Sequence, residues 1–174
     1  MYEKFGQFID GKWQKSEKGE TYDVINPATE EVLGKASKAS ENDVNKALKS
    51  AEKGLEVWRK TPPWERAKII RKIADLMRER TEVLAKWLTL EVGKPLAEAA
   101  GEVGGAADIF EWNSEETKRI YGQIVESRFE NTRMFIKYEP VGVVAALIPW
   151  NFPIVLASRK ISTALAAGCS VICK

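Results

Sequence analysis

The apolar residues fall into patterns that change along the chain, and each pattern predicts a different kind of structure. Up to residue 38 they form short runs separated by turn residues. Asp10-Gly11 lies between two such runs and is a strong signal for a β-hairpin. The runs 21–26 and 32–38, separated by a turn that opens at Asn26-Pro27, predict further short strands. The first part of the chain is therefore predicted to be an arm that packs against the rest.

From residue 40 onward the apolar residues recur every three or four positions, the spacing of one helix face. Ser40 is a suitable N-cap for the first helix, and Thr81 is a suitable cap for the third. Gly101, Gly104 and Gly105 lie inside the last helix and indicate close packing against another backbone, because glycine otherwise lowers helix stability. The predicted helices cover residues 40–58, 64–80, 81–93 and 96–119.

The pattern returns to β-forming residues after Gly122. The segments 123–129 and 134–138 are rich in β-formers, and Glu130-Asn131 is a suitable turn between them. This predicts a two-stranded ribbon. Because an isolated hairpin is only marginally stable in water, the ribbon is expected to lie on another surface, for which a partner subunit is one candidate.

The end of the chain predicts one strand–helix–strand unit. An apolar run, 141–148, precedes the turn Pro149-Trp150-Asn151-Phe152-Pro153, and a helical segment, 154–167, leads to a second apolar strand, 169–174. In parallel sheets ligands bind just outside the carboxyl ends of the strands, where this turn is expected. Asn151 is the uncharged side chain of the turn with both a donor and an acceptor, so it is the predicted chemical tip. A parallel sheet of two strands leaves an edge unpaired, which predicts a fragment or one piece of an assembly.

Composition narrows the class of protein. With 174 residues, of which 44% are hydrophobic and 30% charged, the chain fits one globular domain or slightly more. Its net charge of +2 does not suggest nucleic acid as a partner. No apolar run approaches the roughly 20 residues that span a bilayer. The first residues lack the apolar core of a signal peptide, so a cytoplasmic location is the default prediction.

The cysteine and histidine content limits which catalytic groups, disulfides and metal sites the chain can form. The chain has no histidine, which excludes histidine-based acid–base catalysis within it. On one strand, Cys169 and Cys173 would lie roughly 13 Å apart, too far for a disulfide. A zinc site needs more soft ligands than this chain has, so no metal site is predicted. Both cysteines are predicted to pack as small buried hydrophobic residues.

The turn at 149–153 resembles the signature turn of the NAD(P)-dependent aldehyde dehydrogenase superfamily. Other segments agree with that family in order and spacing, and some most resemble its succinate-semialdehyde dehydrogenase branch. The family segments are YDVINPATEE (22–31), EVGKP (91–95), YEPVGV (138–143) and ALAAG (164–168). The branch segments are EWNSEETKRIYG (111–122), Ser158-Arg159-Lys160 and Gly168-Cys169.

The resemblance implies an α/β fold and a division of the chain into parts. Residues 1–121 would form the N-terminal arm and helices of the cofactor-binding domain. Residues 122–140 would form an oligomerisation ribbon, typical of a homodimer or homotetramer. Residues 141–174 would form the first βαβ unit of a Rossmann-like NAD(P)-binding sheet, with the catalytic domain absent.

The resemblance gives Asn151 a catalytic role. Such enzymes attack the aldehyde with a cysteine thiolate, and Asn151 resembles the amide that donates a hydrogen bond to the resulting oxyanion. The residues alone also allow a second interpretation, in which Asn151 caps the next helix with Pro153 in its first turn.

Other positions match the family's cofactor cleft. Ile148, Pro149 and Trp150, together with Asn151, match residues beside the ribose and nicotinamide of NAD or NADP. Lys174 matches a lysine that bonds the adenosine ribose hydroxyls. The alternative interpretation for the first three residues is that they pack in the core and the turn. The alternative for Lys174 is that it is a charge on a frayed chain end.

A helix face beside the turn matches the family's substrate tunnel. Phe152, Leu156 and Arg159 recur at helical spacing. By resemblance Arg159 pairs with the far carboxylate of succinate semialdehyde, which its guanidinium suits. The alternative is a surface arginine bonded to an acidic side chain. Lys160 matches a lysine near the catalytic base that helps proton movement.

The resemblance covers about the first third of a typical family member. The catalytic cysteine, the general-base glutamate and the glycine-rich phosphate segment would lie beyond residue 174, and Cys169 and Cys173 do not match the nucleophile's motif. The prediction is thus part of an enzyme that oxidises succinate semialdehyde, inactive as this chain alone. The alternatives are an enzyme for another semialdehyde or an aromatic aldehyde, and a truncated, non-catalytic oligomerisation or binding module.

Overall fold

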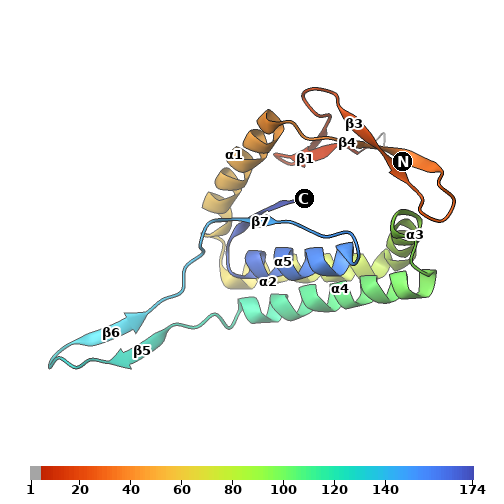
Figure 1. Ribbon diagram of the computed structural model, residues 1–174. Coiled ribbons are helices and arrows are strands. Elements are labelled where there is room, and N and C mark those ends of the chain that lie inside the picture. Colours follow the sequence, from red (N-terminus) through yellow and green to blue (C-terminus); the bar gives the residue numbers. More distant parts are fainter. Residues whose placement is uncertain (1–4) are drawn as a thin grey trace.

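The computed structural model describes residues 5–174, and its elements form helices flanked by small sheets. Figure 1 shows α5 lying along α4, with the strand pair β7–β8 on another side of α5 and the ribbon β5–β6 projecting away from the body. The chain contains both helices and strands, and its last three elements form a strand–helix–strand unit, which confirms the predicted α/β class. Among residues 5–174 no helix is both long and apolar enough to cross a membrane.

The N-terminal arm consists of two antiparallel hairpins, as its alternating runs predict. In the first hairpin Asp10 and Gly11 form the turn with φ angles of 54° and 74°. Such left-handed angles suit the Asp-Gly pair and match the twist of the flanking strands. The strands are β1 (Gln7–Ile9), β2 (Lys12–Gln14), β3 (Thr21–Ile25) and β4 (Val32–Ser37).

The first helix, α1 (Glu41–Trp58), begins at the predicted cap. The Ser40 hydroxyl accepts from the Asp43 N–H at 3.2 Å, and the Ser40 N–H donates to the Asp43 carboxylate at 2.9 Å. Asp43 is buried and also accepts from the Ser16 hydroxyl at 3.1 Å and from the Glu17 N–H at 3.2 Å. These bonds fasten the arm to α1. The pKa of Asp43 lies well below its usual range, mainly because its carboxylate accepts a hydrogen bond from the Ser40 N–H. The other donors lower the pKa further.

We expect Asp43 to make the stability of the arm–helix junction dependent on pH. A carboxyl whose pKa is lowered by folding stabilises the fold fully above its unfolded value and loses that effect as pH falls below about 4. Denaturant unfolding of the wild type and of Asp43→Asn from about pH 6 to pH 3 measures this. The difference between the two should shrink as the pH falls. Asp23→Asn, at an exposed strand position, is the matched control. A constant difference across the range would contradict the prediction.

The next helices are α2 (Pro63–Glu79), α3 (Thr81–Val92) and α4 (Leu96–Thr117), within two residues of their predicted ends. The prediction that Thr81 caps α3 is wrong. Its hydroxyl donates to the carbonyls of Met77 and Arg78 at 3.2 and 2.9 Å, because α2 and α3 follow each other so closely that the hydroxyl reaches the end of α2. Gly93, with φ of 79°, ends α3 as expected.

The main core lies between α2, α4 and α5 (Pro153–Ala166). Ile70 and Phe110 are its largest buried side chains, its other buried members are alanines, and larger, partly buried side chains pack around them. The prediction that the glycines of α4 meet another backbone is wrong for the described residues. A Cβ atom on Gly105 would meet only Val155 Cγ2, at 4.0 Å, and one on Gly101 or Gly104 would meet open space. The buried members of the core cluster are Ile70, Ala74, Ala107, Phe110 and Ala166.

The predicted ribbon is present as β5 (Gln123–Glu126) paired antiparallel with β6 (Arg133–Ile136). Asn131, in the connecting turn, has a φ of 56°, a left-handed angle that asparagine tolerates. The large apolar side chains of Ile124 and Phe135 are exposed on this projecting ribbon. Figure 1 shows it standing clear of the helices.

The C-terminal unit is the predicted βαβ arrangement. β7 (Val143–Ala146) and β8 (Ser170–Cys173) pair in parallel, and α5 connects them. Backbone bonds continue the pairing at the carboxyl ends, where Ile148 N–H donates to the Lys174 carbonyl at 2.7 Å. Cys169 is buried as predicted, but Cys173 is exposed. That prediction is wrong because Cys173 is the last residue of a strand in a two-stranded sheet.

Candidate active site

The turn Pro149–Pro153 emerges at the carboxyl end of β7 and leads directly into α5. Since Ile148 is bonded to Lys174 at the end of β8, the start of the turn and Lys174 lie at the same edge of the sheet. Trp150 is 80% exposed, and Asn151 and Phe152 are exposed beside it. The structure thus places the predicted cofactor residues together at the edge where parallel sheets bind ligands.

Asn151 does not cap α5, so the second interpretation of this residue is wrong. The N-cap is Phe152, with φ of −140° and ψ of 63°, and no side chain of the cap position bonds the helix. Within residues 5–174 the side-chain amide of Asn151 makes no hydrogen bond to the protein. An exposed amide carries two N–H donors and one acceptor, which suits a bound polar group.

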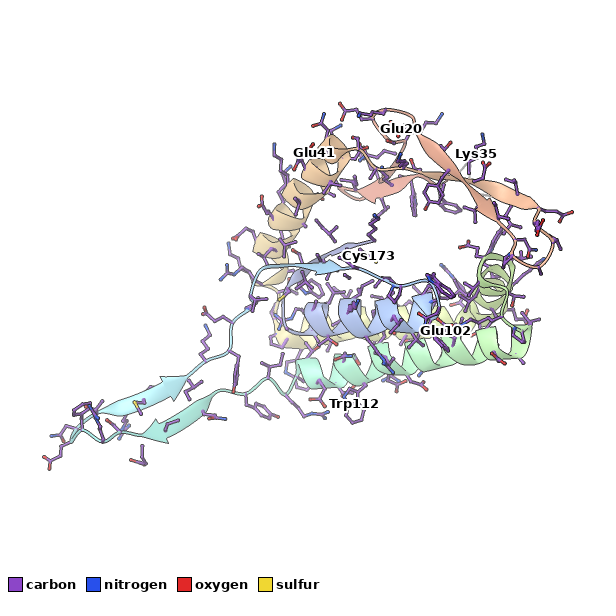
Figure 2. The ribbon with its side chains drawn as sticks, in the orientation of Figure 1. Glu20, Lys35, Glu41, Glu102, Trp112 and Cys173 are labelled. Carbon is purple, nitrogen blue, oxygen red and sulfur yellow. The ribbon has the colours of Figure 1, made fainter. Side chains whose placement is uncertain are left out.

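The cap of α5 comes instead from Glu102, a residue of α4. Its Oε1 accepts from the N–H groups of Ile154 and Val155 at 2.9 and 3.2 Å. These are donors that a helix leaves unsatisfied in its first turn, and a carboxylate there also complements the helix dipole. The first turn of α5 has no acidic residue of its own. Figure 2 shows Glu102 between α4 and the start of α5.

Lys94, in the connection between α3 and α4, completes this arrangement. Its ammonium forms an ion pair with Glu102, and the two side chains are only 10% and 2% exposed. The same ammonium donates to the Asn151 carbonyl at 3.2 Å and lies 4.0 Å from the centre of the Phe152 ring. The main chain of the turn is therefore held from outside by a buried cation.

Lys94 and Glu102 are site residues that are not among those predicted from the sequence. A usable signal was present for Glu102: it is a charged residue on the face of α4 that also carries Ala99, Val103 and Ala106, all buried. Lys94 belongs to the EVGKP segment, which carries part of the family resemblance. An acid within a run of small apolar residues is expected to have a buried partner.

The other end of α5 is also held by side chains from elsewhere. Trp58 Nε1 donates to the Leu165 carbonyl at 2.8 Å, and buried Arg66 donates to the carbonyls of Thr61 and Ala166 at 2.9 and 3.4 Å. Burial lowers the pKa of Arg66. The last turn of α5 has no basic residue, so this guanidinium supplies the charge that complements the dipole.

Lys160 and Arg159, the remaining predicted polar residues, lie on exposed positions of α5. Lys160 donates to the Leu147 carbonyl, which ties the helix to the segment before the turn. Within residues 5–174 Arg159 forms no ion pair with a carboxylate, so the surface pair of the alternative interpretation is not present among them. Leu156, one helical turn before Lys160, is half-buried.

The described residues contain neither a thiolate nucleophile nor a metal centre that the geometry would favour. Although the Cys173 residue is exposed, its thiol is partly desolvated, which raises its pKa, with Lys160 opposing that shift. A raised pKa disfavours the thiolate, which is the nucleophilic form. Over residues 5–174 no group of three or more histidine, cysteine or acidic residues could hold a metal ion.

Comparison with known proteins gives consistent matches over nearly the whole chain. Residues 13–174 match the family described as the aldehyde dehydrogenase family. Glutarate-semialdehyde dehydrogenase of Pseudomonas aeruginosa is 42% identical over 96% of this chain and 35% of its own length. Succinate-semialdehyde dehydrogenase [NADP(+)] of Escherichia coli is 43% identical over 95% and 34%. The 3-sulfolactaldehyde dehydrogenase of Pseudomonas putida is 41% identical over 95% and 34%.

Solved structures agree with these relatives. An NADP-dependent enzyme of E. coli superposes with a TM-score of 0.93 at 42% identity, covering 95% of this chain and 34% of its own. Betaine aldehyde dehydrogenase of Staphylococcus aureus, solved with NAD+, also has a TM-score of 0.93, at 35% identity over 97% and 35%. The chain thus spans about a third of the length of the relatives that it matches.

Proposed function

The chain belongs to the aldehyde dehydrogenase family, and we propose from this premise that it is the N-terminal part of an NAD(P)-dependent enzyme that oxidises an aldehyde to a carboxylic acid. The observation that carries the proposal is the exposed Asn151 amide on the turn at the carboxyl ends of β7 and β8. The whole protein that carries this chain is the complete enzyme. Aldehyde-dependent reduction of NAD+ or NADP+ by the complete enzyme tests the proposal.

Asn151 is proposed to stabilise the negative charge that develops on the aldehyde oxygen when a thiolate adds to the carbonyl. The thiolate would come from the part of the enzyme outside this chain. An amide donor that is already in place needs no reorganisation during the reaction. Such a donor contributes roughly 2.7–4 kcal/mol to lowering the barrier.

The residues at this edge fit a dinucleotide. Trp150 exposes most of its ring, and Ile148 and Pro149 continue the same edge toward Lys174. We propose that these residues hold NAD or NADP, which supplies the hydride acceptor when bound. Relatives are named for NADP or were solved with NAD+, so either dinucleotide is a candidate.

Lys160 is proposed to hold the Leu147 carbonyl, and its part in proton movement stays a prediction.

The substrate is proposed to be succinate semialdehyde or an aldehyde with a similar acidic group. Exposed Phe152 and half-buried Leu156 would contact its carbon chain, and exposed Arg159 would bind its carboxylate. The glutarate-semialdehyde, succinate-semialdehyde and 3-sulfolactaldehyde dehydrogenases act, by their names, on aldehydes that carry a carboxylate or a sulfonate. An aromatic aldehyde without an acidic group would leave Arg159 without this role.

We expect Arg159→Ala in the complete enzyme to change substrate preference. The value of kcat/KM for succinate semialdehyde should fall about 10- to 100-fold, because a charge-assisted hydrogen bond contributes about 1.5–3 kcal/mol. The value for butanal, which has no acidic group, should change little. Arg119→Ala is the matched control, since it removes only an exposed pair with Glu116. A similar loss with both aldehydes would show that Arg159 does not bind the carboxylate.

The ribbon within residues 122–140 is proposed to join subunits of a homodimer or homotetramer. Its exposed Ile124 and Phe135 support this, because large apolar side chains on a projecting ribbon are typical of an interaction surface. The same observation supports the alternative of a non-catalytic oligomerisation module. Activity of the complete enzyme distinguishes the two.

A further inference from the structure

We propose that Lys94 and Glu102 are positioning residues that hold the Asn151 turn for the reaction. The proposal rests on the proposed oxyanion role of Asn151. It adds two side chains that come from the α3–α4 connection and from α4, far from the turn in sequence. A chain of contacts runs from Lys94 and Glu102 to the main chain on both sides of Phe152 and supports the proposal.

The contacts of Glu102 explain why a carboxylate is buried here. Burying an ionised carboxylate is costly unless charge and hydrogen bonds compensate it. One oxygen of Glu102 accepts from two N–H groups of α5, and the other accepts from Lys94. Both oxygens are thus satisfied by the start of α5 and by one cation. The position of α5 relative to α4 is fixed at the point where the turn ends.

Lys94 extends this control to the turn itself. Its ammonium contacts the Asn151 carbonyl and the face of the Phe152 ring while paired with Glu102. A single buried cation therefore links the residue that caps α5 to the main chain of the proposed oxyanion donor. Loss of either charge would leave the other buried without its partner, and the turn would lose its anchor.

The external cap has a chemical consequence for Asn151. Asparagine just before a helix readily uses its side chain to cap the helix or to form local turns. Here Glu102 satisfies the first-turn donors of α5, so the Asn151 amide is not needed for that purpose. The cap from α4 keeps the amide available for the oxyanion.

The kinetic test uses Glu102→Gln and Lys94→Met in the complete enzyme. We expect kcat to fall roughly 10- to 100-fold, because small displacements of a positioned group have effects of this size. The KM for the aldehyde should change much less. Lys94→Arg, which keeps the charge, should recover part of kcat. Glu98→Gln, an exposed acid in the first turn of the same helix, is the matched control and should leave kcat unchanged.

A double-mutant cycle with Asn151→Ala separates positioning from a general structural role. If Lys94 and Glu102 act through Asn151, Glu102→Gln should cause little further loss of kcat in the Asn151→Ala enzyme. Equal losses in both backgrounds would overturn the proposal. If Glu102→Gln does not fold, the same cycle with Lys94→Met gives the same decision.

Amide exchange in the complete enzyme supplies a readout that does not depend on activity. The N–H groups of Ile154 and Val155 should exchange on the order of 10-fold faster in Glu102→Gln than in wild type, measured by hydrogen–deuterium exchange. Unchanged exchange would overturn the capping role. If exchange responds but the complete enzyme oxidises no aldehyde, the proposed function fails. The positioning role is then overturned as well, while the structural cap stands.

Discussion

Replacing Asn151 by alanine in the complete enzyme is expected to lower kcat about 10²- to 10³-fold, because one donor to the oxyanion is lost. The KM for the aldehyde should change far less, since the donor acts on charge that is present only in the transition state. Asn151 is exposed and does not cap α5, so its replacement should not destabilise the fold. A fall in kcat would therefore not be explained by unfolding. Steady-state kinetics with saturating dinucleotide measure both constants.

The control for this change is Asn45→Ala, an exposed asparagine on α1 away from the turn. It should leave kcat unchanged. The folded state of Asn151→Ala should unfold at the same denaturant concentration as the wild type. A kcat within a few-fold of wild type would show that Asn151 is not the oxyanion donor.

Replacing Ile70 by alanine is expected to lower the free energy of unfolding by about 2–5 kcal/mol. Ile70 is 0% exposed and lies in the core cluster between α2, α4 and α5. The other buried members of the cluster are Phe110 and three alanines, and larger, partly buried side chains such as Met77 pack around them. How far these larger side chains move into the space that the change creates sets the cost within that range. Unfolding in urea, followed by circular dichroism, measures it.

Ile69 gives a matched control for the core, because it is the same residue type in the next position of α2. It is 51% exposed, so Ile69→Ala should cost less than about 1 kcal/mol. If both changes cost the same, α2 does not face the core as the structure places it.

Elements with a local cause could be predicted from the sequence. The Asp10-Gly11 hairpin, the Ser40 cap and the end of α3 at Gly93 each depend on a few neighbouring residues. The parallel strand pair also followed from apolar runs on either side of a helical segment. For the hairpin, the cap and the helix end, the residues that decide the backbone are adjacent in the chain.

Elements that depend on distant partners could not be predicted in the same way. The Thr81 hydroxyl bonds the end of α2 because two helices meet without a linker. The cap of α5 joins residues 52 and 53 positions apart, so no local pattern around the turn could show it. For this reason the residues around the turn left Asn151 with two interpretations, and the structure rejects one of them because Phe152 is the N-cap and Glu102 bonds the first-turn N–H groups of α5.

The most direct test of the central claim is the oxidation of succinate semialdehyde with NAD+ or NADP+ by the native protein, isolated from its source with its intact mass determined. We predict a mass well above the 19.5 kDa of this chain, or a partner polypeptide that completes the fold. We also predict reduced dinucleotide that forms only with aldehyde present. A native protein of 19.5 kDa, without a partner and without aldehyde-dependent reduction of either dinucleotide, would contradict the account.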